Sequence, residues 1–326
     1  MKKRAIITGV SGQDGSYLAE FLIESGYDVW GILRRHSLTE QKSARLELAG
    51  ILKNPHLKLV YGDVTDFSSL CHLFNDVQPH EIYNLAAQSH VGISFQQPNL
   101  TSKITGESVL TLLECARLHC PDAKIYQAGS SEMFGNNIDQ DGFQRETTSM
   151  VPVSPYGCAK LYAHNICKVY RASYNMFISN GILFNHESPR RGLNFVTNKI
   201  VKGAVDISQN KEKKLSLGNL ESRRDWGHAH DYIRAMHLML QQESSDEWVV
   251  STGISRSVRD VCEYVFGKLG LDYEDYVVQD VRYLRPEELH DLKGDSTKIR
   301  TYLGWEPIYT FESMMDEMIE YRLTVE

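Results

Sequence analysis

Short apolar runs alternate with segments of helical periodicity through the first 185 residues of the chain. The apolar runs are too short for ordinary helices and stop at small or polar residues, as buried strands do. They cover residues 4–8, 28–33, 57–61, 81–85, 124–128 and 177–184. Segments in which apolar residues recur three and four positions apart cover residues 15–25, 68–76, 99–119 and 155–175. This alternation predicts an α/β fold with a doubly wound parallel sheet and helices on both faces.

Beyond residue 185 the pattern is less regular. Strand-like runs at 214–217 and 248–252 are accompanied by helical segments at 231–242, 257–268 and 311–322. We therefore expect a second, smaller α/β domain over residues 185–326, from which some segments return to the first sheet. No Pro/Gly/Ser-rich linker separates the two parts, so they should share an interface.

Composition and charge limit the classes of molecule that the protein is expected to bind. The 326 residues are 42% hydrophobic and 24% charged, with a formal net charge of -7. This negative balance argues against broad nucleic-acid or membrane-surface binding, which needs a basic face. It leaves room for an anionic small ligand, because basic residues gather within 185–224.

Targeting and redox signals point to the cytoplasm. No apolar run approaches the roughly 20 residues of a membrane span. The basic start, residues 1–4, leads into a short core strand and glycine rather than into a signal peptide. The six cysteines show no C-x-x-C spacing, so we expect reduced, structural thiols.

Three glycines follow the first predicted strand in a G-x-x-G-x-x-G pattern. Glycine permits a tight turn and the close approach of a pyrophosphate, whose charge the following helix N-terminus favours. A plain strand-to-helix turn is the alternative, but the position between a buried strand and a helix favours a dinucleotide site. We interpret residues 1–184 as a Rossmann-like domain that binds a nicotinamide cofactor. Its cofactor contacts should include Gly9, Ser11, Gly12, Gln13, Asp14 and Gly15.

The end of the second predicted strand favours NADP over NAD. An NAD site usually carries an acid about 20 residues beyond the glycines, whereas this strand ends in Arg34 and Arg35. Guanidinium groups suit the 2′-phosphate of NADP. A solvated charge pair is the alternative. Asp63 and Val64, after the third predicted strand, are placed to meet an adenine.

A hydroxyl, a carboxylate and a tyrosine–lysine pair form a candidate acid–base set. Ser130 and Glu132 follow the fifth predicted strand. Tyr156 and Lys160 are four residues apart on a predicted helix, and hence on one face. An ammonium beside a phenol should lower the pKa of Tyr156 from about 10, which would make it a usable base near neutrality.

Glu132 decides which type of reaction we expect. A carbonyl reductase needs a hydroxyl, a tyrosine and a lysine, but no carboxylate beside them. An added carboxylate can remove a proton from the carbon next to a transient ketone. A solvated acid or a helix cap is the alternative interpretation of Glu132.

Two further patterns are interpreted as structural. Tyr264 and Lys268 repeat the four-residue spacing, but no hydroxyl–carboxylate strand end or nucleotide turn accompanies them. Asp225, His228 and His230 suggest a metal site only weakly, because no convincing third ligand lies near them in sequence and hydride chemistry needs no metal. We expect no metal.

Longer strings resemble a known family. They are GQDGSYLAE at 12–20, YNLAAQSHV at 83–91, NGILFNHESPRRG at 180–192, LGNL at 217–220 and RDWGHA at 224–229. On these strings the chain resembles the extended short-chain dehydrogenase/reductases over nearly its whole length, and within them the GDP-mannose 4,6-dehydratase family. The resemblance implies a GDP-sugar-binding role for residues 185–326.

The resemblance also implies a role for individual residues. The family's catalytic threonine falls on Ser130, and Glu132, Tyr156 and Lys160 match directly. Further implied cofactor contacts are Leu85, Ala86, Gln88, Tyr156, Lys160, His186 and Arg191. Implied GDP-sugar contacts are Ser89, Glu132, Asn185, Arg191, Val196, Lys199, Leu217, Gly218, Asn219, Arg224, Arg285 and Glu288.

The implied activity is that of a lyase with an internal redox cycle. An NADP-dependent enzyme would dehydrate a GDP-hexose, GDP-mannose in the first place, to a GDP-4-keto-6-deoxy-hexose by hydride transfer from carbon 4 to carbon 6. Departures from the family at Ser130 and at residues 289–293 keep a GDP-hexosamine or GDP-heptose open as substrate. An NADP-dependent epimerase or reductase and a non-catalytic sensor also stay open. A homodimer or homotetramer is implied, in which residues 35–45 reach a neighbour's cofactor site.

Overall fold

Seven strands rich in β-branched and aromatic residues form one parallel sheet in the computed structural model, which describes residues 2–34, 43–284 and 286–325. The strands are β1 (Arg4–Thr8), β2 (Asp28–Leu33), β3 (Leu57–Tyr61), β4 (Glu81–Asn84), β5 (Lys124–Ala128), β6 (Ile178–Leu183) and β10 (Glu247–Val250). Their order is β10-β6-β5-β4-β1-β2-β3. The chain order reverses between β1 and β4, which is where ligands bind in open α/β sheets.

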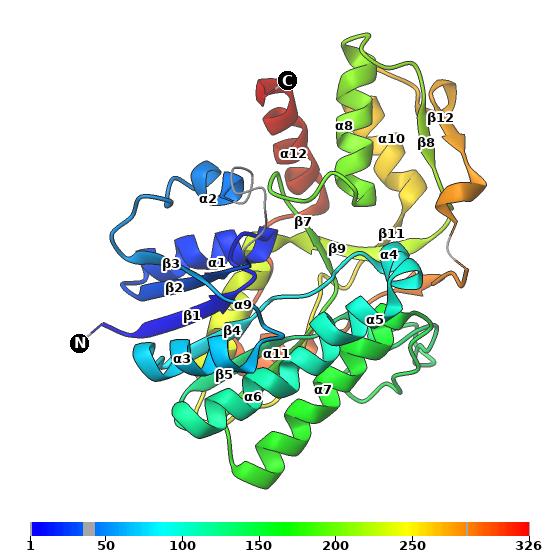
Figure 1. The fold of residues 1–326 in the computed structure, drawn as a ribbon. Coiled ribbons are helices and arrows are strands. Elements are labelled where there is room, and N and C mark those ends of the chain that lie inside the picture. Colours follow the sequence, from blue (N-terminus) through cyan, green and yellow to red (C-terminus); the bar gives the residue numbers. More distant parts are fainter. Residues whose placement is uncertain (1, 35–42, 285, 326) are drawn as a thin grey trace.

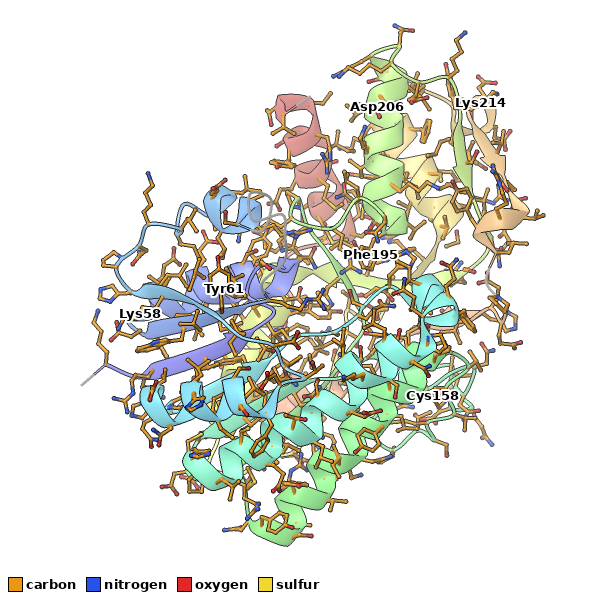
Figure 2. All side chains as sticks on the ribbon, in the orientation of Figure 1. Lys58, Tyr61, Cys158, Phe195, Asp206 and Lys214 are labelled. Atoms are coloured by element: carbon orange, nitrogen blue, oxygen red, sulfur yellow. The ribbon has the colours of Figure 1, made fainter. Side chains whose placement is uncertain are left out.

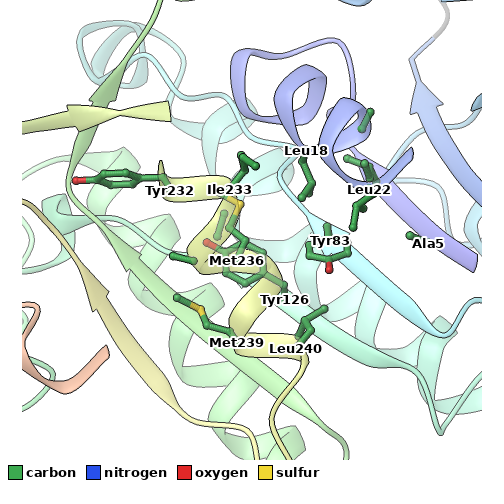
Figure 3. Packing of buried hydrophobic residues seen from close by; sticks show 14 of the residues in the cluster. Ala5, Leu18, Leu22, Tyr83, Tyr126, Tyr232, Ile233, Met236, Met239 and Leu240 are labelled. Atoms are coloured by element: carbon green, nitrogen blue, oxygen red, sulfur yellow. The ribbon is translucent and has the colours of Figure 1, made fainter. Parts of the chain in front are cut away.

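Helices cover both faces of this sheet (Figure 1). The long ones are α1 (Gln13–Glu24), α3 (Phe67–Val77), α6 (Ser108–His119), α7 (Pro155–Tyr174) and α9 (Ala229–Leu240). On one face α1 and α9 pack together, and Figure 3 shows Leu18 and Leu22 of α1 near Ile233 and Met236 of α9. On the other face α3, α6 and α7 bury a second apolar cluster against the strands. The sheet is therefore the middle of three layers, as a doubly wound fold requires.

Shorter helices connect these elements. They are α2 (Ala44–Leu48), α4 (Val91–Gln96), α5 (Pro98–Thr101), the π-helical turn η1 (Ser102–Glu107), the 3-10 turn η2 (Ser131–Met133) and α11 (Thr297–Leu303).

A second group of elements lies beyond the carboxyl edge of the sheet (Figure 1). Its helices are α8 (Val196–Ser208), α10 (Val258–Lys268) and α12 (Phe311–Val325), with the 3-10 turns η3 (Tyr273–Asp275) and η4 (Val281–Tyr283). Its strands are β7 (Asn185–Glu187), β8 (Leu215–Leu217), β9 (Arg223–His228), β11 (Ser255–Ser257), β12 (Val277–Gln279) and β13 (Asp291–Leu292). In the described ranges, β9 pairs with β7, β11 and β13, and β12 pairs with β8. The three helices share a buried core that includes Ile200, Val265 and Met318.

The sequence-based prediction of an α/β fold with a parallel sheet is confirmed, and the predicted strands of this sheet lie within two residues of the observed ones. The helix predicted over 99–119 is interrupted by the π-helical turn η1. The prediction missed the helices α2, α4, α8 and α11 and the short strands β7, β9, β11, β12 and β13. The division at 184/185 came with the expectation that some later segments return to the first sheet, and α9, β10 and α11 lie beyond that point and pack on it.

Two other expectations concerned the cysteines, as reduced thiols, and the absence of a membrane-spanning segment. None of the six cysteines forms a disulfide, and all but Cys158 on α7 are buried or half-buried (Figure 2). Among the helices of the described ranges, none combines the length and the apolar character that crossing a membrane requires.

Candidate active site

A cavity of about 1470 Å³ opens along the carboxyl ends of β1, β4 and β5 and continues toward α8 and η4. Each predicted site residue in the described ranges lines it; only Arg35 and Arg285 lie outside those ranges. The lining predicted for cofactor and catalysis is Gly9, Ser11, Gly12, Gln13, Asp14, Gly15, Arg34, Asp63, Val64, Leu85, Ala86, Gln88, Ser130, Glu132, Tyr156, Lys160, His186 and Arg191. The lining predicted for the sugar nucleotide is Ser89, Asn185, Val196, Lys199, Leu217, Gly218, Asn219, Arg224 and Glu288.

The glycine turn after β1 is packed too tightly for side chains. Gly9 has a φ of +69°, and a Cβ there would lie 3.1 Å from the Leu85 carbonyl oxygen. A Cβ on Gly15 would overlap the Gly9 carbonyl. Gly12 begins α1 without any side-chain cap. The turn therefore leaves backbone at the surface of the cavity, in front of the positive end of a helix.

The first turn of α1 is tied to the segment that follows β6. The Asp14 carboxylate and the His186 ring are 2.9 Å apart, and Gln13 donates to the His186 carbonyl at 3.1 Å. Ser188 in turn donates to the Gln13 side-chain oxygen at 2.8 Å. Burial acts to raise the pKa of Asp14, but attraction to and hydrogen bonding with His186 lower it to about 2. A charged pair therefore joins the turn to β7.

The predicted acid–base set converges at the end of β5. Ser130 accepts a hydrogen bond from the Glu132 amide at 3.2 Å and so begins the turn η2. Ser154 caps α7 through the Gly157 amide at 3.0 Å, which fixes where Tyr156 and Lys160 emerge on the helix. The four predicted catalytic side chains are each at most 9% exposed.

Burial changes the protonation expected for this set. Burial lowers the pKa of Lys160 to about 8, while the Asp14 carboxylate acts to raise it. The Lys160 ammonium donates to the Ala128 carbonyl oxygen at 2.7 Å and lies 5.8 Å from the centre of the Tyr156 ring. The prediction that Lys160 brings the pKa of Tyr156 below its usual range is wrong. Burial raises the pKa of Tyr156 above its usual range, although a hydrogen bond with Ser130 acts in the opposite direction.

Near the carboxyl ends of β2 and β3, the side chains of Arg34, Arg45 and Asp63 line the cavity. Arg34 and Asp63 lie there as the strand ends predict. Although burial acts to raise it, hydrogen bonds from Thr65 hold the pKa of Asp63 below its usual range. Arg45 was expected, as part of residues 35–45, to reach a neighbour's cofactor site. It instead donates within its own chain to the carbonyls of Ser11 at 3.1 Å and Arg190 at 2.6 Å. Its segment has no periodicity or motif that could have indicated this position.

The opposite end of the cavity combines cations with aromatic rings. Arg191 pairs with Glu187 at 3.0 Å and lies 3.6 Å from the centre of the Phe195 ring, at the base of α8 (Figure 2). Lys199 lies 3.6 Å from the Tyr283 ring centre and donates to the Ser216 carbonyl at 2.6 Å. Phe195 and Tyr283 were missed by the sequence analysis.

Arg224 and Glu288 come together at the same end. Arg224 is 6% exposed and donates to the Leu289 carbonyl at 3.0 Å. The Ser222 hydroxyl lies 3.4 Å from the Glu288 carboxylate. The backbone of Leu289 thus supports this end of the cavity.

The residues weighed as a metal site have structural contacts. Asp225 accepts hydrogen bonds from the amides of Thr252 and Gly253, both at 2.8 Å. His228 caps α9 by accepting from the His230 amide at 3.0 Å. No group of three or more metal-ligating side chains occurs in the described ranges.

Tyr264 and Lys268, the second pair with the four-residue spacing, lie on α10 far along the chain from the turn. Both donate to the Asp316 carboxylate of α12, each at 2.8 Å. They join two helices, and neither lines the large cavity.

Comparisons with known proteins extend over nearly the whole chain. A sequence model of the family described as GDP-mannose 4,6 dehydratase matches residues 6–318. GDP-mannose 4,6 dehydratase 1 of Arabidopsis thaliana is 46% identical over 329 residues, which cover 98% of this chain and 89% of that protein. The GDP-mannose 4,6 dehydratase of Homo sapiens is 44% identical over 342 residues, which cover 97% and 90%.

Solved structures share the fold at lower identity. The dTDP-glucose 4,6-dehydratase of Streptomyces venezuelae, with NAD bound, has a TM-score of 0.86 at 22% identity and covers 99% of this chain and 97% of that one. The UDP-glucose 4-epimerase of Thermotoga maritima, with UDP-glucose, has a TM-score of 0.85 at 23% identity and covers 99% and 100%.

Proposed function

The chain belongs to the GDP-mannose 4,6-dehydratase family, and from this membership we propose that it converts GDP-mannose to a GDP-4-keto-6-deoxy-hexose. One observation supports the proposal most directly. The hydroxyl and carboxylate of Ser130 and Glu132 share a cavity with Tyr156, Lys160 and the glycine turn. A reductase needs no such carboxylate, whereas a dehydratase needs a base for carbon 5.

The residues around the turn fit a nicotinamide dinucleotide. A Cβ on Gly9 or Gly15 would meet backbone, so the chain keeps the bare surface that a pyrophosphate approaches. The uncapped N-terminus of α1 favours the pyrophosphate charge. Lys160 and Arg34 line the same cavity, and in this proposal Lys160 would meet the nicotinamide and Arg34 the adenosine.

We further propose NADP as the cofactor. Arg34 lines the cavity, and Arg35 follows it in sequence, outside the described ranges. Arg45 adds a third guanidinium whose burial lowers its pKa while it lines the same cavity. Guanidinium groups suit a 2′-phosphate, and no acid ends β2 to hold a ribose diol instead.

When bound, the cofactor would supply the hydride acceptor for carbon 4 and later the hydride for carbon 6, and its oxidised ring would add a positive charge to the cavity. Tyr156 takes the proton of the sugar's 4-hydroxyl at its phenolic oxygen. The ketone at carbon 4 acidifies the proton on carbon 5, which the Glu132 carboxylate removes. Glu132 returns that proton to the 6-hydroxyl, which leaves as water with help from the Ser130 hydroxyl. When carbon 6 would receive the hydride, carbon 5 takes up a proton, and Tyr156 gives up the proton that it took from the 4-hydroxyl, so the acid–base set ends as it began.

Burial of the acid–base set serves this chemistry. A dry site strengthens every charge interaction within it and keeps water from the transient ketone. Burial acts to raise the pKa of Tyr156, and its hydrogen bond with Ser130 acts to lower it.

The sugar nucleotide should occupy the end near α8. Lys199 and Arg224 offer positive charge there, and Asn219 and Glu288 offer polar contacts. We propose a guanosine diphosphate sugar for this end, with the hexose directed toward Glu132. The assembly proposed is a homodimer or homotetramer. Arg45 folds back on its own chain, so any reach toward a neighbour falls to residues 35–42, outside the described ranges.

A substrate panel tests this proposal. The protein is incubated with catalytic NADP and, separately, GDP-mannose, a GDP-hexosamine, a GDP-heptose, dTDP-glucose and UDP-glucose, and products are identified by mass. We expect GDP-mannose to lose one water with no net change in NADPH absorbance, and Glu132→Gln to abolish most of that loss. Cofactor oxidation or reduction in proportion to product would replace the dehydratase with a reductase or epimerase. Preference for another GDP-sugar would change the substrate alone.

A further inference from the structure

Three polar residues lie side by side in the dry interior of the parallel sheet. Thr8, Asn84 and Gln127 are register partners on β1, β4 and β5, and they are 0%, 2% and 3% exposed. Register partners on neighbouring parallel strands share a face of the sheet. The preceding row on that face is Ile6, Ile82 and Ile125. The sheet is thus apolar until it reaches the site edge and becomes polar there.

Hydrogen bonds join these residues in one direction. Thr8 accepts from the amides of Leu85 and Ala86, both at 3.0 Å, so its hydroxyl proton is given to the Asn84 oxygen at 2.7 Å. Because the Asn84 oxygen accepts, its amino group must face Gln127, to whose oxygen it donates at 2.7 Å. The amino group of Gln127 then donates onward, and the orientation of both amides follows from the chain itself.

This series of hydrogen bonds ends at the Ala128 carbonyl, which also accepts a hydrogen bond from Lys160, the proposed catalytic lysine. Gln127 donates to the Ala128 carbonyl oxygen at 3.1 Å, and the Lys160 ammonium donates to the same oxygen at 2.7 Å. A carbonyl has two lone pairs. Gln127 occupies one of them, so the ammonium is confined to the other.

We propose that Gln127 is a positioning residue for Lys160: by holding the second lone pair of the Ala128 carbonyl, it fixes where the ammonium stands beside Tyr156. The role rests on the proposed function, because it matters only if Lys160 acts in catalysis. Thr8 and Asn84, which precede Gln127 in the series of hydrogen bonds, do not line the cavity. Their part is to orient the Gln127 amide.

Sheet stability alone does not account for this row. An unpaired polar group in a dry interior is costly, and an apolar residue would avoid that cost. The row of isoleucines two residues earlier shows that the same face accepts apolar residues at full burial. The polar row is explained if its last donor, the Gln127 amide, is needed to hold the Ala128 carbonyl that binds Lys160.

The test compares two variants at 127 with a matched buried glutamine. Gln127→Met removes the donor and acceptor at similar length, and Gln127→Glu keeps the size and the acceptor but, when ionised, has no donor. Gln144→Met is the control. Gln144 is 0% exposed, donates to the Asn137 carbonyl at 2.7 Å and accepts from the Lys293 amide at 3.3 Å, away from the cavity lining.

Two readouts separate positioning from folding. The first is the kcat for dehydration, which we expect to fall about 10-fold in both variants at 127, the effect of one hydrogen bond, with KM for the GDP-sugar unchanged. The second needs no substrate: reductive methylation of Lys160 in the ligand-free protein, followed by peptide mass spectrometry. We expect faster labelling of Lys160 in Gln127→Met, which adds no charge, and wild-type labelling in Gln144→Met.

The outcomes are distinct. Wild-type kcat in both folded variants at 127, together with wild-type labelling in Gln127→Met, would overturn the proposal, as would losses that Gln144→Met shares in proportion to its change in Tm. If the wild type fails to dehydrate any GDP-sugar, the proposed function fails. Lys160 labelling still decides whether Gln127 holds the ammonium in that case.

Discussion

Replacing Asp14 with asparagine should destabilise the ligand-free protein far more than the same change at a surface aspartate. Asp14 pairs with His186 at 2.9 Å, with side-chain exposures of 23% and 11%. Asp28 pairs with His56 at 2.7 Å, with exposures of 32% and 39%. The two pairs have the same chemistry and differ in solvent access, so Asp28→Asn is a matched control. Water screens the surface pair and weakens its attraction.

The size of the effect follows from the pKa of Asp14. A pKa lowered from 3.8 to about 2 corresponds, at about 1.4 kcal/mol per unit, to about 2 kcal/mol. Because the folded pKa lies below the unfolded one, this stability is present above pH 3.8 and is lost as pH falls through about 2. Burial acts to lower the pKa of His186, but Asp14 raises it above 6.5. The stability that the protonated His186 contributes is therefore fully present below pH 6.5 and is lost as the pH rises through the pKa of His186 in the folded protein.

Urea unfolding of the ligand-free protein at about pH 5.5 and about pH 8.5 measures both consequences. We expect Asp14→Asn to lower the free energy of unfolding by about 2 kcal/mol at the lower pH and by less at the higher one. Asp28→Asn should cost less at either pH. Equal losses for the two variants, or a loss at Asp14 that does not change with pH, would refute the reasoning that a buried charged pair joins α1 to β7.

The site itself leads to three further predictions. Glu132→Gln should reduce dehydration by roughly 10²–10⁴-fold while calorimetric binding of NADP and GDP-mannose survives; near-wild-type turnover would place the carbon-5 base elsewhere. Arg35→Ala should weaken NADP binding by about 1.5–3 kcal/mol and leave NAD binding unchanged; equal losses would mean that the arginine supports only the fold. Light scattering should give two or four times the 37.2 kDa chain mass, and a single-chain mass would rule out the proposed assembly.

Much of the fold follows from local patterns in the sequence. The strands of the main sheet are short apolar runs between glycines and polar residues, and their length alone separates them from helices. Helix α8 was missed because Thr197, Ile200, Val201 and Val205 are β-branched and favour strands locally. Its packing against α10 and α12 decides in favour of a helix. The π-helical turn η1 leaves no mark on an otherwise regular helical periodicity.

Some residues of the site can likewise be recognised from local sequence patterns, and others cannot. Tyr156 and Lys160 are recognisable because helix geometry places residues four apart on one face. Ser130 and Glu132 are recognisable because they end a buried strand. Arg45, Phe195 and Tyr283 come from segments without periodicity, and only tertiary packing brings them to the cavity.

Protonation was the least predictable property of the site. The spacing of Tyr156 and Lys160 reveals the charge near the phenol but not the exclusion of water from it. Burial dominates in the structure and raises the pKa of Tyr156. An inference from spacing to pKa therefore needs the solvent exposure of both groups.

The central claim is that carbon 4 and carbon 6 of one sugar exchange a hydride through a cofactor that stays bound. GDP-mannose carrying deuterium at carbon 4 tests it directly, with wild-type protein, catalytic NADP and a product analysed by mass and by NMR. The account predicts a dehydrated product that retains the deuterium at carbon 6, without net formation of NADPH. A product that has lost the label to water or to free NADPH would contradict it.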